Sequence, residues 1–145
     1  MQEIKITLFG EPKGKEAPRR AHIKTKDGRE FDISYTNKPT RNYEQLIKSE
    51  YHRLYPSVFL EGAIYLALIA YYPIPKSTSK KKRQLMLERK IRPVVKPDLS
   101  NCLKMIEDGL KGIAFRDDAY IVDEFLRKFY SDRPRVEITL KEWKP

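Results

Sequence analysis

The strongest helix signal in the chain is the stretch PDLSNCLKMIEDGLK, which occupies residues 97–111. Apolar side chains recur in it every third or fourth residue, a spacing typical of a helix with one buried face. They are Leu99, Cys102, Leu103, Ile106 and Leu110. Pro97 and Asp98 suit the start of a helix, and Gly112 suits the position just past its end. We therefore predict a helix from Asp98 to Lys111.

The polar face of this helix carries groups that suit phosphate chemistry. Asn101, Lys104 and Asp108 fall in a narrow sector largely opposite the apolar stripe, and Asp117 and Asp118 follow in a polar turn. If the chain folds back at that turn, several carboxylates converge with Lys104. Carboxylates bind Mg²⁺, which offsets phosphate charge and activates water, and a lysine stabilises charge on a transferred phosphate. Phosphodiester hydrolysis needs such a group.

Each of these residues also has a purely structural interpretation. Asp98 can cap the helix, Lys104 and Asp108 can face solvent, and Asp117-Asp118 can stabilise their own turn. The spacing alone therefore leaves a basic nucleic-acid-binding domain and a basic nuclease equally open.

A basic segment, residues 76–96, directly precedes the helix, and we call it the basic arm. Glu88 is its single acid, and its nine basic residues are Lys76, Lys80, Lys81, Lys82, Arg83, Arg89, Lys90, Arg92 and Lys96. We predict a helix over about Lys80–Arg89 and a mobile remainder. A run of like charge is often merely solvated, but here we predict nucleic-acid contacts from Lys80, Lys81, Lys82, Arg83, Arg92, Lys96 and Asn101.

Length and composition limit the class of protein. The 145 residues suit one domain, and the net charge of +10 favours a polyanionic partner. The single cysteine excludes an intrachain disulfide and fits a reducing compartment. The most apolar stretch, residues 63–72, is far shorter than the roughly 20 residues of a membrane helix. We expect a cytoplasmic protein with no membrane partner.

The rest of the chain predicts strands and one more helix. The expected strands are Glu3–Phe9, a hairpin of Ala21–Thr25 and Glu30–Tyr35 turning at Asp27-Gly28, a central strand Gly62–Tyr72 buried on both faces, and Tyr120–Tyr130 and Val136–Trp143. A helix is expected over Asn42–Tyr55, capped by Thr40 or Asn42. We predict one α+β domain over residues 1–145, a mixed sheet with two main helices packed on one face.

The run KPDLSNCLK, residues 96–104, resembles the K-P-D-x-D-N-x-x-K motif of the RusA family of Holliday-junction resolvases. The resemblance continues through Asp108, GLKG at 109–112, FRDD at 115–118 and Ile121-Val122, and it spans about Arg92 to Tyr130. It implies a small, dimeric, Mg²⁺-dependent endonuclease that cuts branched DNA by paired nicks, in recombination and repair, with Mn²⁺ as a substitute metal.

By position, the resemblance makes Asp98 and Asp118, with Asp117 beside it, the metal-binding carboxylates. It makes Lys104 the catalytic lysine and Asn101 the motif asparagine. A homodimer is implied, and we expect its contact to be built partly from strands or from the Asp98 helix.

One position departs from the motif, because Ser100 stands where the family usually has a second aspartate. A hydroxyl is a weak, neutral ligand, so we name both Ser100 and Glu107 as further metal-site candidates. Glu107 lies on nearly the same helical face, roughly 10 Å along the axis. Two alternatives stay open: a branched-DNA-binding protein that has lost cleavage, and an interaction protein whose basic arm binds RNA or an acidic partner.

Overall fold

A computed structural model describes residues 3–145 and shows a mixed four-stranded sheet in the order β1-β6-β4-β5. Its strands are β1 (Glu3–Phe9), β4 (Ile64–Pro73), β5 (Ile121–Ser131) and β6 (Arg135–Glu142). β6 pairs antiparallel with both β1 and β4, whereas β4 and β5 run parallel. A parallel pair needs a long crossover connection, and here that connection contains the basic arm and the predicted catalytic helix.

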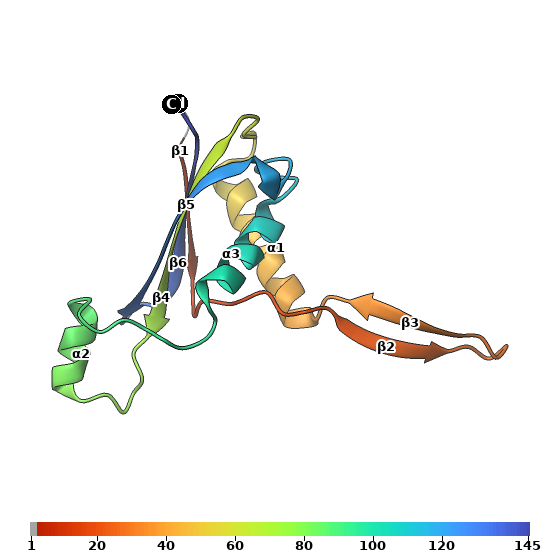
Figure 1. The fold of residues 1–145 in the computed structure, drawn as a ribbon, viewed down its shortest axis with the longest axis horizontal. Helices are drawn as coiled ribbons and strands as arrows, with labels where there is room; N and C mark the ends of the chain where they lie inside the picture. The colour runs from red at the N-terminus through yellow and green to blue at the C-terminus, as the bar shows by residue number, and fades with distance from the viewer. Residues whose placement is uncertain (1–2) are drawn as a thin grey trace.

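Two helices, α1 (Lys38–Leu54) and α3 (Leu99–Leu110), pack together on one face of the sheet, and a shorter α2 (Lys80–Leu87) lies near its foot (Figure 1). Alternate strand residues and the helix stripes meet in one core, which includes Ile6, Leu66, Ile138, Ile47 and Ile106. These findings confirm the α+β fold, the two main helices on one face, and a helix within the basic arm.

Gly109 sets how closely α1 and α3 approach one another. A Cβ atom built at this position would lie only 2.7–3.0 Å from three side-chain atoms of Ile47. A larger residue would therefore push the helices apart. Lys48 also links the two helices, because its Nζ donates a hydrogen bond to the carbonyl of Gly109 at 3.1 Å.

The predicted hairpin is present and stands away from the body. Its strands are β2 (Arg19–Lys24) and β3 (Glu30–Tyr35), and all six residues of β3 are exposed (Figure 1). Gly28 takes the positive φ of 87° that the turn requires. The bounds of β3 match the prediction, whereas β2 begins two residues before Ala21 and ends one residue before Thr25.

The predicted cap of the second helix is wrong. α1 begins at Lys38 because the side chain of Asn37 accepts a hydrogen bond from Thr40 N at 3.2 Å, and neither Thr40 nor Asn42 is the cap. Pro39 fits this earlier start, since the first helical turn does not use its missing N–H.

The expectation that the Gly62–Tyr72 strand is buried on both faces is also wrong. β4 is central, but its burial alternates: Leu66 and Leu68 are buried, whereas Tyr65 and Ile69 are only half-buried. α1 and α3 cover one face alone. On the other face, cations cover the aromatic rings, as where Arg135 lies 3.8 Å from the ring centre of Tyr71.

Candidate active site

The predicted motif, residues 96–104, contains the start of α3. Asp98 is the residue before the first helical turn, and its carbonyl accepts a hydrogen bond from Cys102 N at 3.1 Å. Its exposed side chain forms no capping hydrogen bond among the described residues. The carboxylate of Asp98 therefore does not have the structural role that the capping interpretation gave it.

β4 anchors this end of the helix. The hydroxyl of Tyr72 donates a hydrogen bond to the carbonyl of Pro97 and lies 3.8 Å from Cys102 Sγ. Burial raises the pKa of Tyr72, and the nearby Cys102 and the charge of Asp98 raise it further. Tyr72 thus remains a neutral hydroxyl that fixes the backbone next to Asp98.

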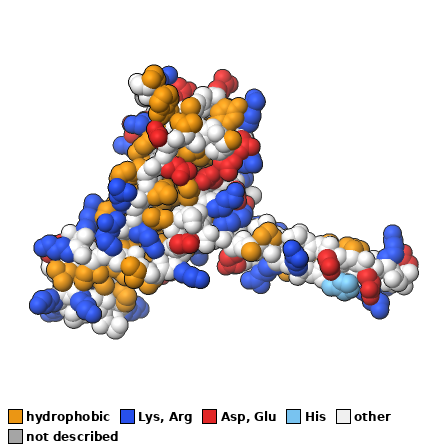
Figure 2. Space-filling view, in the orientation of Figure 1, with side chains coloured by type: hydrophobic (Ala, Val, Ile, Leu, Met, Phe, Trp, Pro, Cys, Tyr) orange, Lys and Arg blue, Asp and Glu red, His pale blue; other side chains and the backbone are white. Residues whose placement is uncertain are grey.

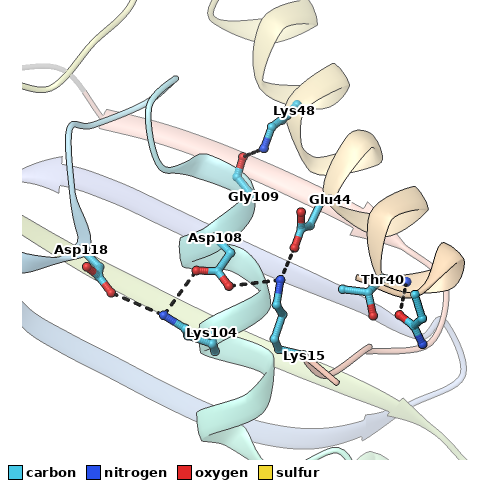
Figure 3. A network of polar contacts seen from close by, with 9 residues as sticks. Lys15, Thr40, Glu44, Lys48, Lys104, Asp108, Gly109 and Asp118 are labelled. Atoms are coloured by element: carbon cyan, nitrogen blue, oxygen red, sulfur yellow. Dashed lines mark hydrogen bonds and ion pairs between the residues drawn. The ribbon is translucent and has the colours of Figure 1, made fainter. Parts of the chain in front are cut away.

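Lys104 lies between two carboxylates, as the sequence predicted. Its Nζ is 3.3 Å from Asp108 Oδ1, one turn along α3, and 3.7 Å from Asp118 Oδ2, across the following turn (Figure 3). The hydrogen bond and the charge of Asp108, and then the charge of Asp118, raise the pKa of Lys104. The lysine therefore stays cationic, and with its side chain 52% exposed it is accessible to a phosphate.

A further pair of charges extends this arrangement to α1. Lys15 Nζ lies 3.2 Å from Asp108 Oδ2 and also bonds Glu44, so acids and lysines alternate from Glu44 to Asp118 (Figure 3). Burial lowers the pKa of Lys15, but its bonds to Glu44 and Asp108 outweigh that effect and leave the pKa raised. Sequence reasoning missed Lys15 and Glu44, because neither belongs to a motif.

Three carboxylates gather near the other side of α3. Burial, followed by the charges of Glu124 and Asp118, raises the pKa of Glu107 to about 7. Glu124 reaches this position because it pairs with Leu66 in the sheet and so faces the helices. The sequence alone does not show that Glu124 pairs with Leu66. Lys104 offsets only part of this negative charge, and the remainder favours a bound divalent cation.

Asp117, next to Asp118, stabilises the turn in which it lies. Its Oδ1 accepts a hydrogen bond from Ala119 N at 3.1 Å, which caps the short 3₁₀ turn Asp118–Tyr120. Its Oδ2 lies 3.8 Å from Lys111 Nζ. Hydrogen bonding with the side chain of Asp118 and with the backbone N–H of Ala119 lowers the pKa of Asp117. The turn-stabilising interpretation therefore describes Asp117, while Asp118 is the member of the pair that contacts Lys104.

The remaining predicted ligands are spread along α3. Ser100 is exposed one turn before Lys104, and Glu107 lies two turns beyond Ser100. Within residues 3–145, no three His, Cys, Asp or Glu side chains are close enough together to form a complete metal shell. The carboxylate oxygens of Asp118, Glu107 and Glu124 are nevertheless the ligand type that Mg²⁺ prefers.

The basic arm forms an exposed cationic surface. Lys80, Lys81, Lys82 and Arg83 are all exposed on α2, and Lys96 is exposed just before the motif. In Figure 2, acidic side chains gather near the middle of the body and basic side chains surround α2.

Two other predicted contacts also belong to the arm and its neighbouring helix. Arg92 makes contacts within the protein. Its Nε donates a hydrogen bond to Lys128 O at 2.7 Å, and its guanidinium lies 4.3 Å from the ring centre of Phe129. The side chain of Asn101 is exposed, and its carbonyl accepts from Lys15 N at 3.1 Å.

A lysine set among carboxylates, on a helix that follows an exposed cationic segment in the chain, defines a candidate nuclease site. The model of the family described as endodeoxyribonuclease RusA matches residues 10–141, nearly the whole chain. The chain therefore belongs to the RusA endodeoxyribonuclease family. YqaN of Bacillus subtilis (strain 168), described as an uncharacterized protein, is 34% identical over 145 residues, which cover 98% of each chain. In residues 3–145, every helix is too short or too polar to span a membrane.

Proposed function

We propose that this protein is a Mg²⁺-dependent endonuclease that resolves four-way DNA junctions by paired nicks, one from each copy of a homodimer, during recombination and repair. The observation that carries the proposal is the position of Lys104 between Asp108 and Asp118, on the helix that follows the exposed basic arm in the chain. A pure binding protein gains nothing from carboxylates in this place, because they repel phosphate unless a metal intervenes. The proposed location is the cytoplasm, where the DNA substrate lies.

The metal ligands that we propose are Asp98, at the start of α3, and Asp118, which has Glu107 and Glu124 as neighbouring sources of negative charge near the other end of the helix. Bound there, Mg²⁺ or Mn²⁺ would offset phosphate charge and activate water. Glu107 supports this choice, because burial together with the neighbouring charges of Glu124 and Asp118 raises its pKa to about 7. A divalent cation would relieve that repulsion.

Lys104 and the basic arm act directly on the DNA. The ammonium group of Lys104 donates to a non-bridging phosphate oxygen and stabilises the charge that grows there during cleavage. Lys80, Lys81, Lys82 and Arg83 bind backbone phosphates without regard to base sequence. We expect Asn101, which is exposed one turn before Lys104, to contact the same strand.

Synthetic junctions with one labelled strand at a time test the proposal. With Mg²⁺, the full chain should nick the junction at paired positions and leave linear duplex intact. D98N and D118N should abolish cleavage and keep junction binding. D123N is the matched control, because Asp123 is exposed on β5 and, opposite Tyr65, faces away from α3. Undiminished cleavage by both D98N and D118N would contradict the assignment.

A second candidate function is junction binding without cleavage, and Ser100 is the observation that favours it. Tight, junction-selective binding with no nicking in either Mg²⁺ or Mn²⁺ would establish this candidate in place of the first.

A further inference from the structure

The face of the sheet that is turned away from α1 and α3 carries a row of aromatic rings near the foot of the sheet, where α2 lies (Figure 1). In the register, Phe9, Arg135, Tyr71 and Phe129 lie side by side across β1, β6, β4 and β5. Phe125 lies on the same face of β5, opposite Ala67. Neighbouring strands are about 4.8 Å apart, so the row from β1 to β5 spans roughly 14 Å. The rings therefore form a platform rather than a pocket.

Guanidinium groups lie over each of these four rings, with their central carbon 3.8–5.7 Å from the ring centre. The pairs are Arg89 and Arg92 over Phe129, Arg127 over Phe125, Arg135 over Tyr71 and Arg133 over Phe9. We call these residues the arginine–aromatic patch. Arg135 is half-buried, and the other four arginines are exposed. The patch therefore presents flat cations, supported on rings, to solvent.

The charge of the arginine–aromatic patch favours a polyanion. Beside its five arginines lie three acids, Glu88, Asp132 and Glu137, and two further cations, Lys90 and Lys128. Glu137 lies 3.3 Å from Arg135 and Glu88 lies 3.6 Å from Lys90, so two of the acids are already paired. A second copy of this chain is a poor partner, because two such faces would bring like charges together. A nucleic acid supplies the opposite charge along its whole length.

The exposed rings favour an unpaired strand over a duplex. Phe9 is 63% exposed and Phe125 is 40% exposed. A duplex hides the faces of its bases and offers mainly phosphates, which cations bind without help from rings. The bases of an unpaired strand stack on aromatic rings and on guanidinium planes, while cations bind its phosphates. Arginine suits this role better than lysine, because only its planar group stacks.

A groove leads from the arginine–aromatic patch to the start of α3. Its volume is about 590 Å³, and its lining includes Arg92 and Arg127 of the patch together with Leu99, the residue after Asp98. β5 is the last strand of the sheet, so the groove runs around a free edge. A flexible strand can follow that edge from one face of the sheet to the other.

We propose that the arginine–aromatic patch binds an unpaired DNA strand, and that this strand reaches the patch from the start of α3 around the edge of β5. The rings hold bases, and the arginines hold both bases and phosphates. The choice of DNA, and of Asp98 as the point where the strand leaves the duplex, rests on the proposed function. The binding of an unpaired strand itself requires neither metal nor cleavage.

Fluorescence anisotropy of the full chain, without metal, tests the proposal with a labelled oligothymidine of about 15 nucleotides and a blunt duplex of about 20 base pairs. F9A/F125A should weaken oligothymidine binding at least about tenfold and duplex binding less than about threefold, because only unpaired bases stack on the rings. R127Q/R133Q should also weaken oligothymidine binding and flatten its salt dependence. F59A is the matched control, because Phe59 is 44% exposed but precedes the opposite end of β4.

The route around β5 is tested with the same duplex carrying a single-stranded tail. The wild-type protein should bind the tailed duplex at least about fivefold more tightly than the blunt one, and F9A/F125A should remove the difference. R41Q, at an exposed position on α1, is the control for the arginines and should keep wild-type affinity for every probe. Far-ultraviolet circular dichroism should show that each variant keeps the secondary structure of the wild type.

Wild-type affinity for oligothymidine in both double variants would overturn the inference. So would an equal loss on the blunt duplex, because the patch would then bind phosphates alone. A wild-type dimer that becomes a monomer in F9A/F125A, measured by sedimentation velocity, would instead make the patch a contact between copies. Since D98N should bind oligothymidine as the wild type does, failure of this inference is distinct from a failure of the proposed nuclease activity.

Discussion

Lys104 Nζ lies 3.7 Å from Asp118 Oδ2, which joins the polar face of α3 to the turn that precedes β5. The two residues belong to different elements, and the turn between them brings the chain back along the helix. This contact places a cation beside a carboxylate that the family motif assigns to metal binding. Cleavage should therefore depend on the lysine and on the acids around it.

Lys104→Gln should slow cleavage about 100- to 1,000-fold, because it removes a donor that acts on charge in the transition state. Junction binding should change far less, since most of the proposed phosphate contacts come from the basic arm. Single-turnover rates and gel-shift affinities measure the two effects separately. Lys111→Gln is the control, because Lys111 contacts Asp117 rather than Asp118. Equal losses in the two variants would show that Lys104 has no special role.

Ser100→Asp and Glu107→Gln distinguish a weakened metal site from a rearranged one. If Glu107 supplies the missing charge, Glu107→Gln should impair cleavage severely, while Ser100→Asp adds like-charge repulsion and helps little. If the site is simply short of charge, Ser100→Asp should cut faster at low Mg²⁺. Cleavage rates across a Mg²⁺ titration give the answer. Unchanged metal dependence in both variants would exclude both explanations.

The raised pKa of Glu107 predicts a pH dependence of stability. Its folded-state pKa of about 7 exceeds the ordinary value of 4.5, so between these values the folded protein binds more protons than the unfolded chain. The contribution of Glu107 to stability should therefore be lost as pH rises from about 4.5 towards about 7. After allowance for solvent screening, the loss should be on the order of 1 kcal/mol.

Urea unfolding of the wild-type protein and of Glu107→Gln at pH 5 and pH 8 measures this contribution as a difference. The variant should gain stability relative to the wild type at the higher pH. Mg²⁺ should then stabilise the wild type more than the variant. A difference that is the same at both pH values would show that Glu107 is not held near its neighbouring carboxylates.

Replacing Lys80, Lys81, Lys82 and Arg83 with Gln should weaken binding to all DNA sequences alike. The slope of log affinity against log salt should fall by roughly one unit for each phosphate that the arm no longer neutralises. Lys26→Gln, near the turn of the hairpin, is the control and should leave the slope unchanged. If the slope stays the same in the quadruple variant, the basic arm is merely solvated.

Lys15→Met should destabilise the fold by about 1 kcal/mol, because it leaves Glu44 and Asp108 without their shared cation in a partly buried place. A double-mutant cycle with Glu44→Gln measures the coupling. The second change should cost much less in the Lys15→Met background. Additive losses would show that the bridge contributes nothing to the contact between α1 and the loop.

Local periodicity explains what the sequence predicted well. The apolar stripe of α3 and the alternation of Ile4, Ile6 and Leu8 directly record a buried face, and the structure confirms both. The contact of Lys104 with Asp108 follows from their spacing of one helical turn. The contact of Lys104 with Asp118 requires the chain to turn back after α3. The spacing alone left that turn open, and only the family resemblance implied that Asp118 lies near Lys104.

Interactions between distant segments explain what was missed. Lys15 reaches Asp108 only because the loop before the hairpin packs on Pro97 and Asn101. Glu124 faces Glu107 because a register shift near the start of β5 determines which of its residues turn towards the helices. The apolar run in β4 suggested two buried faces, but Tyr65 and Tyr71 lie beneath side chains of neighbouring strands instead.

The parallel pairing of β4 with β5 has an evolutionary consequence. Such a pair requires a connection that crosses the sheet but sets no upper limit on its length, and lengthening a loop costs little free energy. Here both the exposed cations of the basic arm and the helix with Lys104 belong to that connection. Insertions or deletions between Ile74 and Pro97 can therefore alter the extent of the cationic surface, while every strand keeps its register and the core stays unchanged.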